Sequence, residues 1–199
     1  MAGLTGVITF VIDSNLTTNR AGSPGGAIMA QGTALVLSGS ALASNTASAG
    51  GAVAALDCVG SFNTYSSSFA NNSASGFSGA VAASSCNTTF NASSLDSNQG
   101  TAGCAVYSGL GLGASGLAGA FMLQLTVCEV SRNRASAGSG GGIMASGVNV
   151  TLLGDAMGSG KYAAMTGGSV AVVGGSLAVS GTATGGNSAG GLQESTTFV

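Results

Sequence analysis

The sequence predicts an all-β fold, a parallel β-helix of about six to seven coils, from three observations. A tetrad of the form Gly-Gly-Ala-(Ile/Val) recurs along the 199-residue chain. A second element, Leu-x-x-Asn or a close relative, stands about nine residues ahead of the tetrads. Around this second element Ile12, Ser14 and Leu16 fit one face of a strand, whose side chains repeat with a period of two.

The spacing of both elements indicates one stacked array with a single interruption. The branched residue of the tetrad recurs at intervals of 25, 28, 25, 37 and 27 residues, and the asparagine at 26, 27, 26 and 35. Both series lengthen at the same point, so we expect one insertion near residues 109–120. Equivalent residues of successive coils would then stack about 4.8 Å apart and form two buried columns. The first is Ile28, Val53, Val81, Val106, Ile143 and Val170, and the second is Leu16, Leu42, Phe69, Leu95 and Val130.

Glycines and asparagines are expected at the corners of each coil. Glycine fits where the chain turns with positive φ or lets another segment pass closely. Asparagine tolerates the left-handed region, and stacked carboxamides can hydrogen-bond from coil to coil. We expect a structural ladder that binds no ligand, formed by Asn19, Asn45, Asn72, Asn98 and Asn133.

The composition excludes several classes of function. Charged residues make up only 5% of the chain, and four Lys and Arg with a net charge of −2 cannot form a basic surface for nucleic acid. No run of about eighteen apolar residues is present, so no membrane-spanning segment is expected in this chain. A surface so short of charge must be solvated by Ser, Thr and Asn, by backbone, by attached sugar or by a neighbour.

The paired motifs resemble the repeats of the polymorphic outer membrane proteins of chlamydiae. Phe69-Ala70-Asn71-Asn72-Ser73-Ala74 is the nearest match to the Phe-x-x-Asn repeat, and the resemblance covers roughly residues 12–172. It implies a right-handed parallel β-helix of the pectin-lyase-like class, used as a surface-exposed adhesive or structural domain. Most Phe-x-x-Asn sites here have Leu or Val in place of Phe, Cys104 replaces a tetrad glycine, and the sixth unit lacks the asparagine.

Two cysteines occupy equivalent places in neighbouring coils. Cys58 and Cys86 each lie six residues beyond the tetrad alanine. Stacking would place their Cα atoms about 5 Å apart, within the range of a disulfide. They form either an inter-coil disulfide in an oxidising compartment or a pair of small apolar side chains in a packed stack. Cys128 stands at the position that Ser14, Ser40, Ser67 and Ser93 hold in other units.

Five asparagines stand in Asn-x-Ser/Thr sequons and are candidates for glycosylation if the protein is secreted by a eukaryote. The chain is rich in Ser and Thr, so chance occurrence is the competing explanation. The candidates are Asn15, Asn71, Asn87, Asn91 and Asn149.

No catalytic or cofactor site is predicted. The absence of histidine excludes Ser-His-Asp and Cys-His arrangements, and no Cys-x-x-Cys pair suggests a metal. Asp and Glu stand at scattered coil positions, whereas glycosidic chemistry needs two carboxyl groups about 5–9.5 Å apart. The match of residues 111–116 to a dinucleotide-binding fingerprint lacks the βαβ context that this motif needs.

We therefore expect residues 1–199 to form a single β-helix repeat domain, a piece of a longer protein because Gly190-Gly191-Leu192 resembles the start of another tetrad. Its expected role is non-catalytic, structural or adhesive, outside the cell or at its surface, and in a bacterium associated with the outer membrane. Expected partners are glycans or other surface proteins held by weak multivalent contacts, and exposed coil ends could associate end to end. The alternative is the scaffold of a polysaccharide-acting enzyme whose catalytic coils lie outside this chain.

Overall fold

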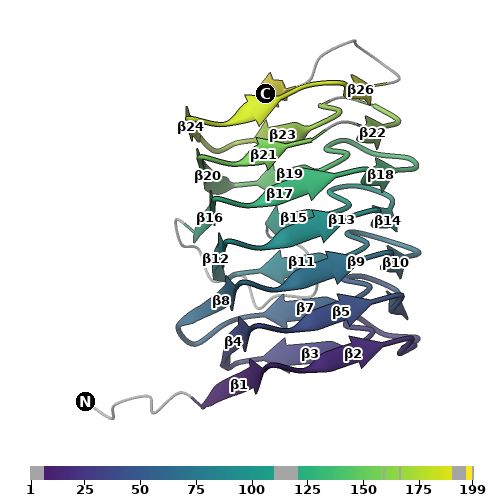
Figure 1. Cartoon of the computed structure of the whole chain (residues 1–199), viewed down its shortest axis with the longest axis vertical. Helices are drawn as coiled ribbons and strands as arrows, with labels where there is room; N and C mark the ends of the chain where they lie inside the picture. Colours follow the sequence, from purple (N-terminus) through teal and green to yellow (C-terminus); the bar gives the residue numbers. More distant parts are fainter. Residues whose placement is uncertain (1–6, 110–120, 159, 166, 190–195, 199) are drawn as a thin grey trace.

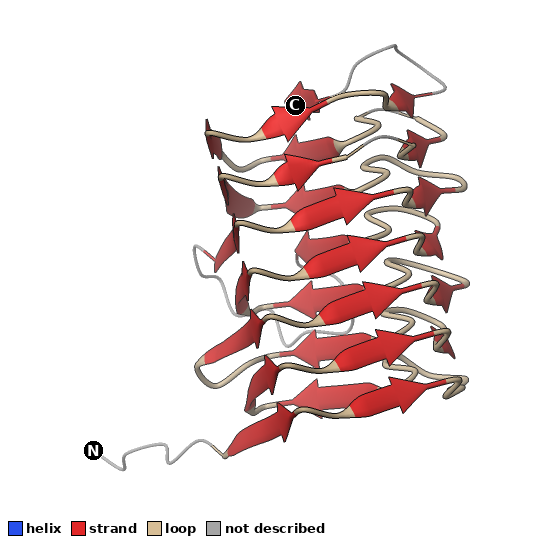
Figure 2. Cartoon of the chain, viewed as in Figure 1, coloured by secondary structure: helices blue, strands red, loops and turns tan. Residues whose placement is uncertain are grey.

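The protein is a right-handed parallel β-solenoid of about six turns, as seen in a computed structural model (Figure 1). The structure describes residues 7–109, 121–158, 160–165, 167–189 and 196–198. Within these ranges all regular structure is strand, and the strands are joined by turns and short loops (Figure 2). The all-β parallel prediction is therefore confirmed. The insertion predicted near residues 109–120 lies, apart from Gly109, outside the described residues.

Each full coil contributes four short strands. The strands form four sheets in which every pairing is parallel. In chain order the sheets are named A, B, C and D. Sheet A comprises β1 (Ile8–Ile12), β4 (Ala34–Ser38), β8 (Ser61–Tyr65), β12 (Asn87–Asn91), β16 (Phe121–Thr126), β20 (Val148–Leu153) and β24 (Leu177–Ser180). Sheet B comprises β2 (Asn15–Thr17), β5 (Ala41–Ala43), β9 (Ser68–Ala70), β13 (Ser94–Asp96), β17 (Glu129–Ser131), β21 (Ala156–Met157) and β25 (Ala183–Thr184).

Sheets C and D complete the coil on either side of the glycine-rich loops. Sheet C is the narrowest because its strands are only two residues long. It comprises β6 (Thr46–Ala47), β10 (Ser73–Ala74), β14 (Gln99–Gly100), β18 (Arg134–Ala135), β22 (Tyr162–Ala163) and β26 (Ser188–Ala189). Sheet D comprises β3 (Ile28–Gln31), β7 (Val53–Leu56), β11 (Val81–Ser84), β15 (Val106–Gly109), β19 (Ile143–Ser146), β23 (Val170–Val173) and β27 (Thr196–Phe198).

The register of the strands confirms both predicted columns. Ile28 pairs with Val53 and Val53 with Val81, and the pairing continues without a shift to Val170. The second column is likewise in register from Leu16 to Val130. Burial of such a side chain stabilises the fold by roughly 1.5–3 kcal/mol, so these columns supply much of the core.

Sheet A adds a part of the core that the motifs did not predict. Phe62 and Phe90 are fully buried there and meet edge to face with ring centroids 5.8 Å apart. Phe90 also contacts Phe69 of sheet B at 6.0 Å. The three rings pack together across sheets A and B, and Thr88 and Thr64 are the register partners of Phe62 and Phe90.

Glycine is required at the two tetrad positions for two different physical reasons. The first glycine, such as Gly50 with φ 56°, turns the chain in the left-handed region. The second has no room for a side chain: a Cβ atom at Gly51 would lie 2.2 Å from the carbonyl oxygen of Gly79 in the next coil. The tetrad therefore begins with a turn and a close approach between coils before the chain enters sheet D.

The left-handed conformation that we expected at the ladder asparagines belongs to the residue before each of them. Positive φ occurs at Thr18, Ser44, Asn71, Ser97 and Arg132, each of which directly precedes a ladder asparagine. The carboxamide that follows points inward, so the turn and the ladder bond are made by successive residues.

Candidate functional site

The ladder asparagines form a continuous chain of hydrogen bonds at the corner between sheets B and C. Asn45 Nδ2 donates to Asn72 Oδ1 at 3.0 Å, and the backbone N–H of Asn45 donates to the same oxygen at 2.9 Å. Asn45 Nδ2 also donates to the carbonyl of Leu16 in the preceding coil at 2.9 Å. The same pattern extends to Asn133, and Asn45, Asn72, Asn98 and Asn133 are buried. Such saturated carboxamides hold adjacent coils together and leave no free group for a ligand.

Lys161 takes the place of the asparagine in the sixth unit. Its side chain is buried, and Nζ donates to the carbonyl of Val130 at 3.1 Å, the bond that asparagine Nδ2 makes in the other coils. Nζ also donates to the carbonyl of Gly158. Burial lowers the pKa of Lys161 from 10.5 to about 8. Asn187 resumes the ladder in the next coil, where its Oδ1 accepts the backbone N–H of Lys161 at 3.3 Å.

A second ladder occupies the corner between sheets A and B. The N–H of Ser40 donates to Ser67 Oγ at 3.1 Å, and the N–H of Ser67 donates to Ser93 Oγ at 3.2 Å. Cys128 and Asp155 continue this column, and Asp155 Oδ1 accepts the N–H of Cys128 at 2.7 Å. Burial raises the pKa of Asp155, against the opposing effect of N–H bonds from Cys128 and Leu153.

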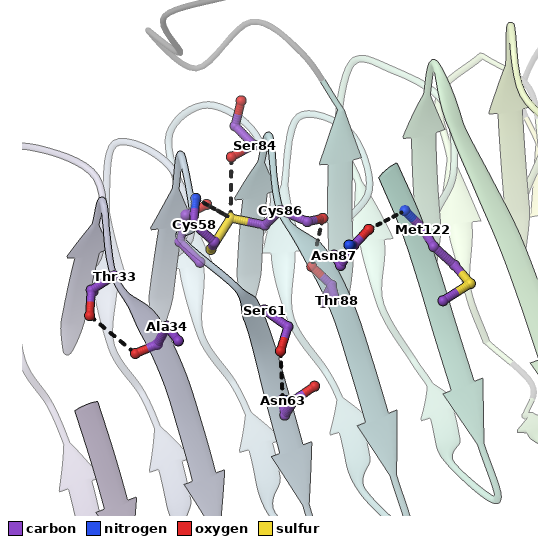
Figure 3. Close-up of a disulfide and its surroundings, with 11 residues drawn as sticks. Thr33, Ala34, Cys58, Ser61, Asn63, Ser84, Cys86, Asn87, Thr88 and Met122 are labelled. Carbon is purple, nitrogen blue, oxygen red and sulfur yellow. Dashed lines mark hydrogen bonds between the residues drawn. A yellow bond between two sulfur atoms is a disulfide. The ribbon is translucent and has the colours of Figure 1, made fainter. Parts of the chain in front are cut away.

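Cys58 and Cys86 form a disulfide between adjacent coils at the corner between sheets D and A (Figure 3). Their Cα atoms are 5.0 Å apart, as stacking of equivalent positions requires. The N–H of Cys58 points at Cys86 Sγ at 3.3 Å, which repeats the geometry of the serine ladder with sulfur as the acceptor. The bond closes a segment of one full coil.

The other two cysteines are buried free thiols. Cys104 packs with Ala135 and Ala163, and its thiol donates to the carbonyl of Arg134 at 2.7 Å. Burial raises the pKa of Cys104 to about 12, and burial also raises the pKa of Cys128. Neither thiol is therefore an activated nucleophile, because reactivity requires an accessible thiolate.

All five sequon asparagines are exposed. This separates them from the ladder asparagines, which are buried except for Asn19 in the first coil. At Asn87 and Asn149 the hydrogen bonds among the described residues use Oδ1, which accepts from Met122 and Ser176 respectively. Among the described residues, Nδ2 of these two asparagines, to which a glycan would be attached, donates no bond. The exposed set is Asn15, Asn71, Asn87, Asn91 and Asn149.

Two carboxylates that we expected to be scattered are brought together on the outer face of sheet B. Ser131 Oγ donates to Asp96 Oδ1 at 2.7 Å and lies 3.5 Å from Glu129 Oε1. Arg132 Nη2 forms an ion pair with Asp96 Oδ2 at 2.7 Å. Partial burial acts to raise the pKa of Asp96, but hydrogen bonds from Arg132, Ser131 and Ser97 outweigh it, so this pKa lies below its ordinary value. Asp96 is consequently ionised near neutral pH and is a poor general acid.

A shallow hollow is lined by residues of β6 and β10 and by the residues around Arg20 in the first coil. Its volume is about 330 Å³. It combines one guanidinium with several hydroxyl groups and contains no carboxylate, so its chemistry suits a polar or anionic ligand. Its lining is Arg20, Ala21, Gly22, Thr46, Ala47, Ser48, Ser73, Ala74 and Ser75.

The hollow is one end of a longer polar row. The residues that pair through successive strands of sheet C share one outward position, while the next residue of each strand points into the core. Near the middle of the row Arg134 lies over the ring of Tyr162, with its guanidinium carbon 5.5 Å from the ring centroid. The row consists of Arg20, Thr46, Ser73, Gln99, Arg134, Tyr162 and Ser188.

Across the described ranges no three His, Cys, Asp or Glu side chains are placed to hold a metal ion. The same part of the chain contains no helix of the length and apolarity needed to cross a bilayer. In comparisons with known proteins, no family model, no curated protein and no solved structure matches this chain.

Proposed function

We propose that this chain is a non-catalytic segment of an extracellular or cell-surface protein, and that it binds glycans weakly and repeatedly through the outer face of sheet C. The observation that carries the proposal is the row from Arg20 to Ser188, in which a polar side chain recurs at every coil. A polymer lying along the solenoid axis would meet a similar contact at each step of about 4.8 Å. Many weak contacts of this kind add up to useful avidity.

The chemistry of the row favours a carboxylated sugar over a neutral one. A guanidinium offers paired N–H donors that match a carboxylate, and hydroxyl groups such as those of Thr46 and Ser73 suit sugar hydroxyls. Arg20 and Arg134 are separated by four strand steps, about 19 Å, so one extended chain can contact both. Tyr162 adds an aromatic ring beside the second guanidinium.

Two other features are consistent with a location outside the cell. A disulfide between Cys58 and Cys86 would persist in an oxidising compartment. Five exposed sequons could carry sugar on a surface that has few charges. We retain the resemblance to the repeats of polymorphic outer membrane proteins and to pectin-lyase-like β-helices as part of this proposal.

Binding to immobilised polygalacturonate, compared with neutral dextran, tests the proposal. The double variant Arg20→Gln, Arg134→Gln should weaken the retention of polygalacturonate by about tenfold or more, a difference of about 1.4 kcal/mol. Arg132→Gln is the matched control, because Arg132 is exposed but pairs with Asp96 on sheet B. An equal loss in the control, or no preference of the wild type for the acidic polymer, would refute the assignment of sheet C.

One observation favours a second candidate, a polysaccharide-acting enzyme. Asp96 and Glu129 converge on Ser131, and paired carboxylates are the core of glycosidic chemistry. The ion pair that keeps Asp96 ionised argues against this role. Release of reducing ends or unsaturated ends from polygalacturonate by the wild type, with loss of that activity in Glu129→Gln, would favour the enzyme. If the wild type shows no turnover, glycan binding remains the proposed function.

A further inference from the structure

The row on sheet C holds its two guanidinium groups at a fixed separation. Arg20 pairs with Thr46, and the register continues through Ser73 and Gln99 to Arg134. Arg20 and Arg134 are therefore four strand steps apart, about 19 Å of backbone spacing. The strands β10, β14 and β18 lie one above the other along the long axis of the solenoid (Figure 1). The separation is consequently set by paired backbone.

Both guanidinium groups are available to an anion. Arg20 and Arg134 are exposed, and the only ion pair among the described residues joins Arg132 to Asp96 on sheet B. The three row residues between Arg20 and Arg134 are uncharged. A guanidinium binds a carboxylate through two parallel N–H donors. An acidic polymer lying on the row therefore meets two cationic contacts with neutral polar contacts between them.

The two guanidinium groups have different surroundings. Arg20 lines the hollow of about 330 Å³ together with Thr46 and Ser48, whose hydroxyl groups suit the hydroxyl groups of a sugar. Arg134 lies over the ring of Tyr162 in the next coil, with its guanidinium carbon 5.5 Å from the ring centroid. This cation–π contact favours one placement of the guanidinium. We call Arg20 the first anchor and Arg134 the second anchor.

We propose that the row selects acidic polysaccharides by length, and that the separation of the two anchors determines the shortest chain that binds tightly. This inference rests on the proposed glycan-binding function of sheet C. A short oligomer reaches one anchor only. A chain that reaches both makes its second contact intramolecularly, so effective concentration raises its affinity. Affinity should therefore rise abruptly at the chain length that spans about 19 Å.

Equilibrium binding of labelled oligogalacturonides of defined length tests this inference. The salt concentration is held constant, because salt screens contacts between surface charges. For the wild type we expect weak binding of the shortest oligomers. An increase of about tenfold is expected at the first oligomer whose end carboxylates can lie about 19 Å apart, which we call the threshold length. Arg134→Gln should remove this increase. Arg132→Gln, which alters an arginine on sheet B, should retain it.

Moving the second anchor along the row separates the effect of length from that of net charge. Arg134→Gln with Gln99→Arg places the anchors three strand steps apart, about 14 Å. Arg134→Gln with Tyr162→Arg places them five steps apart, about 24 Å. Both double variants keep the net charge of the wild type. The threshold length should become shorter in the first variant and longer in the second.

Two results would overturn the inference: a wild-type affinity that rises smoothly with chain length, or relocated anchors that leave the threshold length unchanged. Gln99 and Tyr162 are exposed, and circular dichroism must show the wild-type sheet spectrum in both double variants. Each double variant tests the shift independently, so either one suffices if the other fails that check. A wild type that binds polygalacturonate without a threshold length refutes only this inference. A wild type that binds neither oligomers nor polymer refutes the proposed function as well.

Discussion

Asn98 Oδ1 accepts two hydrogen bonds from Asn72, one from the backbone N–H and one from Nδ2, each at 3.0 Å. Both residues are buried, so neither carboxamide can exchange these bonds for water. A carboxamide that links two coils through backbone and side chain together explains why asparagine recurs at this corner. The role of the ladder is therefore structural, because its donors and acceptors are used inside the solenoid.

The ladder should be most sensitive to substitution in its middle. Asn72→Ala removes bonds to Asn45, Asn98 and the carbonyl of Leu42, and leaves buried polar groups without partners. We expect the free energy of unfolding to fall by about 3 kcal/mol or more. Asn19→Ala loses only the side-chain bond at an exposed end and should cost less than about 1 kcal/mol. Urea unfolding of the two variants measures the difference, and equal losses would contradict the ladder.

The two roles of glycine can be separated with a matched pair. Gly51→Ala puts a Cβ atom 2.2 Å from a carbonyl oxygen of the next coil, and we expect a loss of about 3 kcal/mol or more in stability. Gly32→Ala, with φ +64° but no atom within 4 Å of the added Cβ, should lose only about 1–2 kcal/mol. Thermal and urea unfolding test this order. A larger loss for Gly32→Ala would show that backbone conformation, rather than close approach, dominates.

The disulfide should stabilise the stack by restricting the conformations that the unfolded chain can adopt. It joins residues separated by 28 positions, for which loop-closure entropy corresponds to about 3–4 kcal/mol. The double variant Cys58→Ser, Cys86→Ser should lose about that much while keeping an acceptor for the N–H of residue 58. Treatment of the wild type with reductant should have a similar effect. Mass spectrometry of non-reduced peptides identifies the bond, and free thiols at both positions in secreted material would contradict it.

Lys161 should give the stability a distinctive dependence on pH. Between its folded pKa of about 8 and the ordinary 10.5, the folded protein has lost the proton that the unfolded chain still binds. The free energy of unfolding of the wild type relative to Lys161→Met should therefore rise with pH across this window, by about 1–3 kcal/mol. Taking the difference cancels the cysteines and tyrosines, which both proteins share. A difference that stays flat from pH 7.5 to 10.5 would show that the lysine is solvated.

Repetition made part of this fold predictable from the sequence. Ile28 and Val53 stand at the same place in two similar motifs, so their stacking followed from spacing alone. The inner columns of sheet A could not be predicted in this way, because one of them changes from Leu35 to Phe62 to Thr88 along the axis. There the physical requirement is filled volume, which different side chains can meet in different coils.

Comparison of equivalent positions also failed to predict some of the polar contacts. Lys161 follows Met157 by four residues, whereas Asn133 follows Val130 by three. Neither residue type nor spacing therefore identifies the lysine as a member of the ladder. Asp96 and Glu129 occupy different columns and meet only as diagonal neighbours of adjacent coils. A comparison of equivalent positions does not detect such a pair.

Cross-linking of paired positions tests the in-register stack most directly. Ser68 and Ser94 are register partners on the outer face of sheet B, so Ser68→Cys with Ser94→Cys should form a disulfide on oxidation. Ala70→Cys with Ser94→Cys displaces one partner by two residues on the same face and should not, because the Cα atoms then lie about 8 Å apart. Peptide mapping of the first pair as cystine and of the second as free thiols is the predicted result. Efficient cross-linking of the displaced pair, or none of the first, would contradict the stacking of equivalent residues.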